Sequence, residues 1–91
     1  MDKTISLILY SKPGCHLCEG LAAKLAEIEN LQLNLEIRDI TTQPDWWERY
    51  QYEIPVLCLK QGKVEQPLPR FSPRTSVTKI TDMLIKYSQN P

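Results

Sequence analysis

Short apolar segments alternate with amphipathic segments along this chain. Residues 5–10 form an apolar run closed by Ser-Lys-Pro-Gly, which predicts a buried strand. Residues 33–38 alternate between apolar and polar, which predicts a second strand with one more polar face. Residues 52–59 predict a third strand with a proline near its start, and Gln61-Gly62 predicts a tight hairpin into a short fourth strand.

Apolar residues at helical spacing fill the intervals between these strands. After Cys15 a helix is predicted whose buried face consists of Leu17, Leu21, Leu25 and Ile28. A short helix is predicted to begin near Pro44, with one of the paired residues Trp46 and Trp47 packed and the other half exposed. The last helix is predicted to begin with Ser72 as its N-cap and Pro73 as its first residue. Its buried face would comprise Val77, Ile80, Leu84 and Tyr87.

The order of these elements is β-α-β-α-β-β-α. The first strand, helix and strand form a crossover unit, which predicts parallel pairing with a right-handed connection. The hairpin predicts an antiparallel pair. The sequence therefore predicts an α/β fold with a four-stranded mixed sheet flanked by three helices, and its 91 residues predict one domain, 1–91.

The charge balance of the chain argues against two classes of partner. Eleven basic and eleven acidic residues cancel, and neither sign forms a block, so we expect neither a nucleic-acid partner nor a membrane partner. The first apolar run is too short for a secretory signal or a membrane span, so we expect a cytoplasmic location. In that reducing compartment a Cys-x-x-Cys pair is more often catalytic than structural. We also expect the protein to be a monomer.

The Cys15-His16-Leu17-Cys18 segment lies where a predicted strand is followed by a predicted helix. The free N–H groups and the positive dipole end of a helix start stabilise a thiolate, so we expect a lowered pKa for Cys15. Cys18 lies one turn further on the same helix face. These positions predict Cys15 as the attacking thiol and Cys18 as the resolving thiol, with a Cys15–Cys18 disulfide as the oxidised form. Lys12 and His16 are candidates for tuning the thiolate.

Other roles for the cysteines stay open at this stage. A zinc site normally needs four ligands, whereas the chain offers one pair, a distant Cys58 and the enclosed His16, so no metal site is expected. A permanent structural disulfide would suit an oxidising compartment. Cys58 is expected to be a small buried hydrophobe in its strand, the alternative being a third redox thiol.

The segments Tyr10-Ser11-Lys12-Pro13-Gly14-Cys15-His16-Leu17-Cys18 and Ile54-Pro55-Val56 carry a resemblance that covers nearly the whole chain. The chain resembles the glutaredoxin branch of the thioredoxin fold, and most of all the small glutaredoxin-like proteins with a Cys-His-Leu-Cys centre. The resemblance implies a disulfide oxidoreductase that uses a dithiol mechanism. It also implies a cis Ile54–Pro55 bond facing the cysteines, with Ile54 and Pro55 binding an extended substrate segment.

The chain departs from the glutathione-using members of that branch. It has Cys-His-Leu-Cys in place of Cys-Pro-Tyr-Cys and lacks a Gly-Gly turn before the last helix. Arg70 and Arg74 are candidates for holding a carboxylate of glutathione or of an acidic partner, the alternative being ordinary surface charges.

The expected function is reduction of protein disulfides or of glutathione mixed disulfides, with a role in electron transport and cell redox homeostasis. The expected partners are a disulfide-containing protein or glutathione, with regeneration by a thioredoxin-type or glutathione-dependent reducing system. No tightly bound cofactor is expected, and glutathione is a candidate co-substrate. The alternatives are a redox-sensing or binding adaptor, and a carrier of a [2Fe–2S] cluster bridged between two protomers through the first cysteine and glutathione.

Overall fold

The computed structural model describes residues 4–88. Its strands form one four-stranded sheet in the order β2-β1-β3-β4. The elements, in chain order, are β1 (Thr4–Ser11), α1 (His16–Ala26), β2 (Gln32–Asp39), the 3-10 helix η1 (Ile40–Thr42), α2 (Pro44–Tyr50), β3 (Val56–Gln61), β4 (Val64–Pro67) and α3 (Val77–Ser88). The predicted α/β architecture is confirmed. Among the helices of residues 4–88, none has the length and apolar composition needed to cross a membrane.

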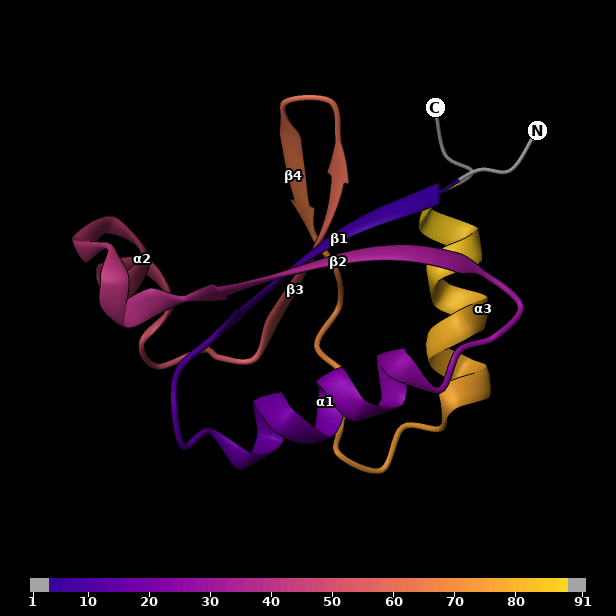
Figure 1. Cartoon of the computed structure of the whole chain (residues 1–91), viewed down its shortest axis with the longest axis horizontal. Helices are drawn as coiled ribbons and strands as arrows, with labels where there is room; N and C mark the ends of the chain where they lie inside the picture. The colour runs from indigo at the N-terminus through magenta and orange to yellow at the C-terminus, as the bar shows by residue number, and fades with distance from the viewer. Residues whose placement is uncertain (1–3, 89–91) are drawn as a thin grey trace.

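Strand β1 is at the centre of this arrangement. It pairs in parallel with β2, with Leu7 opposite Leu35, and antiparallel with β3, with Ile8 opposite Cys58. The crossover from β1 to β2 runs through α1, which lies against α3, whereas α2 lies at the far end of the sheet from α3 (Figure 1). The two predicted pairings, β1 parallel with β2 and β3 antiparallel with β4 in the hairpin, are confirmed. The C-terminal end of β1 leads directly into the Cys15 loop.

Alternation along β1 divides the interior into two clusters. Side chains from one face of the sheet pack with α1 and α3 in the first cluster, which we call the α1–α3 core: Ile5, Leu7, Leu9, Leu21, Leu25, Ile28, Leu57, Leu59, Leu68, Ile80 and Leu84. Side chains from the other face pack with η1 and α2 in the second, which we call the α2 core: Ile8, Tyr10, Ile40, Tyr50 and Cys58. A strand that is buried on both faces gives a continuous apolar run, as residues 5–10 do.

A polar network closes the edge of the α2 core. The buried Tyr10 hydroxyl donates to Glu65 Oε1 at 2.6 Å and accepts from Arg38 Nη1 at 2.9 Å. The ring of Tyr10 stacks on Tyr50 and meets Trp46 edge-on, with ring centroids 4.3 and 5.8 Å away. Burial and the Glu65 hydrogen bond raise the pKa of Tyr10, and the hydrogen bond from Tyr10 lowers the pKa of Glu65. The network therefore joins β1, β2 and β4 to α2.

Three details, in α1, β2 and the hairpin, differ from the prediction. Leu17 is 51% exposed, whereas Cys18 in the same first turn of α1 and Leu21 one turn later are buried. Ile37 is 58% exposed on the edge strand β2. The hairpin turn comprises Gly62 and Lys63 rather than Gln61-Gly62, since Gln61 pairs with Val64 and Gly62 has the positive φ, 62°, that favours glycine.

The predicted start of the last helix is wrong. Ser72 and Pro73 lie in a turn, and α3 begins at Val77 with Ser76 Oγ accepting from the Lys79 N–H at 3.1 Å. The reason is a long-range contact. The ammonium of Lys24 in α1 donates to the carbonyls of Pro73 and Thr75 at 2.5 and 2.7 Å, and a helix from Pro73 would need both carbonyls for its own ladder. The buried face of α3 is as predicted, with Ile80 and Leu84 fully buried.

Glu65→Gln tests the network around Tyr10. Because the pKa of Glu65 lies below its ordinary 4.5, its contribution is present above pH 4.5 and is lost as pH falls through the folded-state value. We expect the variant to lose about 0.5–1 kcal/mol of stability at pH 7. The range is low because Glu65 is partly exposed and solvent screens its interactions. Urea unfolding followed by far-UV circular dichroism at pH 7 and below pH 4.5 should show this difference shrinking in acid. The matched control is Glu48→Gln on the exposed side of α2, and an equal loss in both variants would contradict the assignment.

Candidate redox site

Cys15 is held at the start of α1 by a short turn that leaves β1. Gly14 adopts φ 82°, a conformation that other residues rarely adopt, and the Cys15 N–H donates to the Lys12 carbonyl at 3.3 Å. Cys15 itself is the N-cap of α1, with extended backbone angles. The turn therefore fixes the Cys15 sulfur at the positive end of an eleven-residue helix.

The sulfurs of Cys15 and Cys18 are bonded as a disulfide, with their Cα atoms 5.3 Å apart. The Cys18 N–H donates to Cys15 Sγ at 3.2 Å, so the sulfur takes the place that a serine or aspartate oxygen has in an ordinary N-cap. A negative charge on that sulfur would be stabilised by the same N–H group and by the helix dipole. The local geometry thus favours a thiolate at Cys15 once the disulfide is reduced.

The two sulfurs differ in access. Cys18 is 1% exposed, whereas Cys15 is intermediate between buried and exposed. A reagent or substrate disulfide can therefore reach Cys15 first. Cys18 contacts a separate hollow on the other side of α1, of about 300 Å³, whose lining includes Lys12, Glu19 and Asp39.

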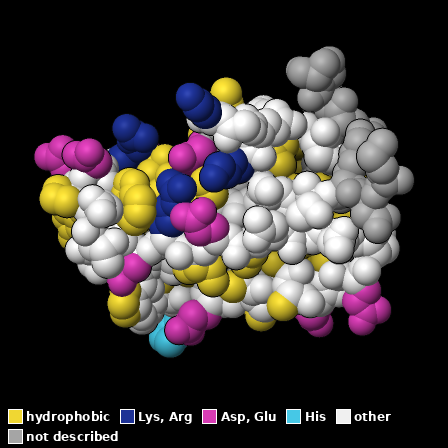
Figure 2. Space-filling view, turned by 45° about the horizontal axis from the view of Figure 1, so that its top comes forward, with side chains coloured by type: hydrophobic (Ala, Val, Ile, Leu, Met, Phe, Trp, Pro, Cys, Tyr) yellow, Lys and Arg dark blue, Asp and Glu magenta, His cyan; other side chains and the backbone are white. Residues whose placement is uncertain are grey.

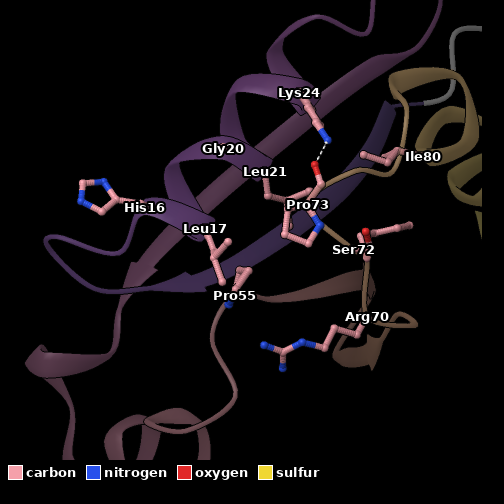
Figure 3. Close-up of a pocket in the computed structure, with 11 residues that line it drawn as sticks. His16, Leu17, Gly20, Leu21, Lys24, Pro55, Arg70, Ser72, Pro73 and Ile80 are labelled. Carbon is pink, nitrogen blue, oxygen red and sulfur yellow. Dashed lines mark hydrogen bonds between the residues drawn. The ribbon is translucent and has the colours of Figure 1, made fainter.

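His16 and Lys12, the two candidates for tuning the Cys15 thiolate, have different surroundings. The His16 side chain is 93% exposed and faces Glu19 on the next turn, with Nδ1 3.4 Å from Oε2. It projects from the surface beside an acidic side chain (Figure 2) and away from the adjacent groove (Figure 3). The Lys12 ammonium lies 5.9 Å from the centre of the Trp47 ring, while its backbone carbonyl holds the Cys15 N–H.

The Ile54–Pro55 peptide bond is cis, the isomer that the resemblance implied. The Ile54 N–H donates to the Tyr50 carbonyl at 3.1 Å, and the Glu53 N–H donates to the same carbonyl at 2.9 Å. The resemblance implied that Ile54 binds an extended substrate segment. The Ile54 N–H is not free for this, because the carbonyl at the end of α2 already accepts it. The Ile54 side chain packs against the α2 core, and Pro55 contributes to the groove described next.

A groove of about 420 Å³ begins at the two residues between the cysteines and runs between α1 and the segment before α3 (Figure 3). We call it the Leu17 groove. Leu17 points toward Pro55 across its mouth. The lining residues are His16, Leu17, Gly20, Leu21, Lys24, Pro55, Arg70, Phe71, Ser72, Pro73 and Ile80.

Of the two candidate arginines, the structure brings only Arg70 to this groove. Arg70 Nη1 donates to the Glu53 carbonyl at 2.8 Å, which links the segment before α3 to the Pro55 loop. Arg74 is exposed and is not among the lining residues. Leu17, Lys24 and Phe71 were not identified as site residues from the sequence, because helical periodicity assigned Leu17 to the core and no local motif marks the other two.

Cys58 lies outside this site. It is 1% exposed within the α2 core, and burial, with a smaller effect of Glu65, raises the pKa of its thiol to about 11. A thiol in that environment stays protonated at neutral pH and reacts slowly. Within residues 4–88 no group of three or more His, Cys, Asp or Glu side chains lies close enough to hold a metal ion.

Comparisons with known proteins point to one fold and one family. A family model described as "Glutaredoxin-like domain (DUF836)" matches residues 6–85. Thioredoxin 1 from the thermophilic eubacterium Thermosipho africanus TCF52B is similar in structure, with a TM-score of 0.55 and 11% sequence identity over 92% of this chain and 94% of that chain. At this identity the likeness shows the fold alone, which is thioredoxin-like. A comparison with curated proteins gave no match.

Alkylation of the reduced protein tests the unequal access of the three cysteines. A short pulse of iodoacetamide at pH 7 should modify Cys15 first, because it alone combines exposure with the start of a helix. Mass spectrometry of the digested protein should find Cys18 and Cys58 largely unmodified. Cys15→Ser should abolish the fast phase, and equal labelling of Cys15 and Cys18 would contradict this reading.

His16→Gln tests whether the histidine acts on the thiolate. Because the side chain is exposed to solvent and faces Glu19, we expect it to have little electrostatic effect on the thiolate, and the Cys15 alkylation rate at pH 7 to change by less than about two-fold. A decrease of ten-fold or more, measured by the same pulse, would make His16 a tuning residue. Glu19→Gln serves as the control that removes the partner of His16.

Proposed function

The chain belongs to the glutaredoxin-like domain family, and from this premise we propose that it is a thiol–disulfide oxidoreductase that reduces protein disulfides or glutathione mixed disulfides. One observation carries the proposal: the Cys15 sulfur caps α1 and accepts the Cys18 N–H, while Cys18 is buried within bonding distance behind it. This arrangement supports two thiols with different roles.

The proposed reaction begins with the reduced protein. The Cys15 thiolate attacks one sulfur of the substrate disulfide, a bond forms between Cys15 and that sulfur, and the other substrate sulfur leaves as a thiolate. Cys18 then loses its proton and attacks the Cys15 sulfur. The mixed disulfide breaks, the second substrate thiolate leaves, and the Cys15–Cys18 disulfide forms. Two electrons pass from the protein to the substrate.

The surroundings of each sulfur suit its step. The Cys18 N–H and the helix dipole stabilise the thiolate form of Cys15, which favours attack without a separate base. Cys18 is shielded from bulk substrates, and the hollow that it shares with Lys12 and Asp39 gives a route for its proton to reach solvent. The buried position of Cys18 limits its attack to the neighbouring Cys15 sulfur.

The oxidised protein needs a thiol donor to return to its dithiol form. We propose a thioredoxin-type or glutathione-dependent reducing system in the cytoplasm as that donor, with the protein acting as a monomer. The proposed partners are thus disulfide-containing proteins, with glutathione as a candidate co-substrate. Pro55 and the carbonyl of Ile54 are the proposed contacts for an extended substrate segment, since the Ile54 N–H is already satisfied.

Cys18→Ser tests this assignment directly. The variant keeps the attacking sulfur and lacks the resolving one. It should therefore accumulate an adduct in which Cys15 is disulfide-bonded to one sulfur of the substrate, which is either insulin or a glutathione mixed disulfide. Non-reducing gel electrophoresis and intact mass should detect the adduct, and dithiothreitol should release it. Cys15→Ser should form none under the same conditions, and Cys58→Ser should behave as the wild type in turnover. Absence of any adduct with both substrates would reject the oxidoreductase proposal.

A further inference from the structure

The Leu17 groove carries information about which disulfides this site prefers. Leu17 is 51% exposed although it lies between the two cysteines. A single exposed leucine is common on protein surfaces and means little alone. Here the leucine is continuous with a cavity whose other apolar residues include Leu21, Phe71 and the fully buried Ile80. These three come from α1 and from both sides of the 72–76 turn.

The polar groups around the groove are largely bonded within the protein. The Lys24 ammonium donates to the Pro73 and Thr75 carbonyls, the Arg70 guanidinium donates to the Glu53 carbonyl, and the Ile54 N–H donates to the Tyr50 carbonyl. A small polar ligand that depended on several new hydrogen bonds would have to displace these contacts. An apolar side chain can enter without breaking any of them.

The charged side chains among the residues that line the groove are of one sign. Its lining includes Lys24 and Arg70 and no aspartate or glutamate. A guanidinium has five N–H donors, and Arg70 uses one of them on Glu53, so the remaining donors can meet a carboxylate at the rim. A partner segment that combines an apolar residue with a neighbouring acidic residue complements both properties.

We propose that the Leu17 groove selects protein disulfides in which a large apolar residue flanks the attacked cysteine and an acidic residue lies beyond it. This inference rests on the proposed oxidoreductase function and names its substrate class. The flanking apolar side chain enters between Leu17, Pro55 and Phe71, and the acidic residue faces Arg70. Glutathione has carboxylates but no large apolar side chain, so it meets only the second requirement.

The test compares three disulfide-linked peptide dimers. The first has Leu on both sides of its cysteine and Glu beyond, the second has Ser in place of Leu, and the third has Lys in place of Glu. Reduced protein is mixed with each peptide in excess, quenched with acid and measured by mass, which gives a second-order rate constant without an added reductant. We expect the Leu peptide to react about 10- to 100-fold faster than the Ser peptide, the range for one apolar group in a fitting pocket.

Leu17→Ser provides the matched variant for the apolar requirement. It should bring the ratio of the Leu and Ser rate constants close to one. The control is Val64→Ser, an apolar residue with 63% exposure on β4 that does not line the groove, and it should keep the wild-type ratio. Arg70→Gln should remove the preference for Glu over Lys, and added salt should weaken that preference in the wild type.

The possible results test the apolar selectivity, the role of Arg70 and the proposed function separately. Equal rate constants for the Leu and Ser peptides, or a faster reaction with a glutathione mixed disulfide than with the Leu peptide, would overturn the selectivity. Equal rates for the Glu and Lys peptides would overturn the role of Arg70. If no peptide and no glutathione mixed disulfide oxidises the protein, the proposed function itself fails, and that result differs from loss of selectivity alone.

Discussion

Burial of β1 on both faces is the constraint on which the rest of this structure depends. The strand pairs with β2 on one side and β3 on the other, while its alternate side chains enter the α1–α3 core and the α2 core. Neither core would be complete without it. Because β1 cannot shift by one residue without exchanging the side chains of the two cores, its end is fixed, and so is the position from which the Cys15 turn begins.

Local sequence was sufficient to predict most of this framework. Apolar runs and alternation located the strands, and the strand–helix junction located the Cys15–Cys18 pair with unequal access, because these features depend on residues close together in the chain. Ser72-Pro73 failed as a helix start for the opposite reason. The motif suits an N-cap, but Lys24, some 49 residues away, takes the carbonyls that such a helix would need. The periodicity and spacing of residues along the sequence carry no information about such a long-range hydrogen bond.

Leu17 shows a second limit of periodicity. Helical spacing correctly grouped it with Leu21 and Leu25 on one face of α1, and that face is buried from Leu21 onward. Periodicity identifies the face of a helix but not where the neighbouring layer ends. In the first turn of α1 Cys18 is buried, whereas Leu17, which was predicted for the core, lies at the mouth of a groove. The same misplacement explains why the groove itself could not be predicted.

The contacts that build the groove also restrict what can enter it. Lys24 and Arg70 are natural anion ligands, but part of the donor capacity of each is already used within the protein. In the structure both side chains donate hydrogen bonds to backbone carbonyls of neighbouring segments, so both form part of the wall of the Leu17 groove. Releasing either donor for a ligand would leave a carbonyl without its partner, which lowers the gain from the new bond. An apolar side chain involves no such exchange, and therefore the wall that makes the groove also favours an apolar occupant over a purely polar one.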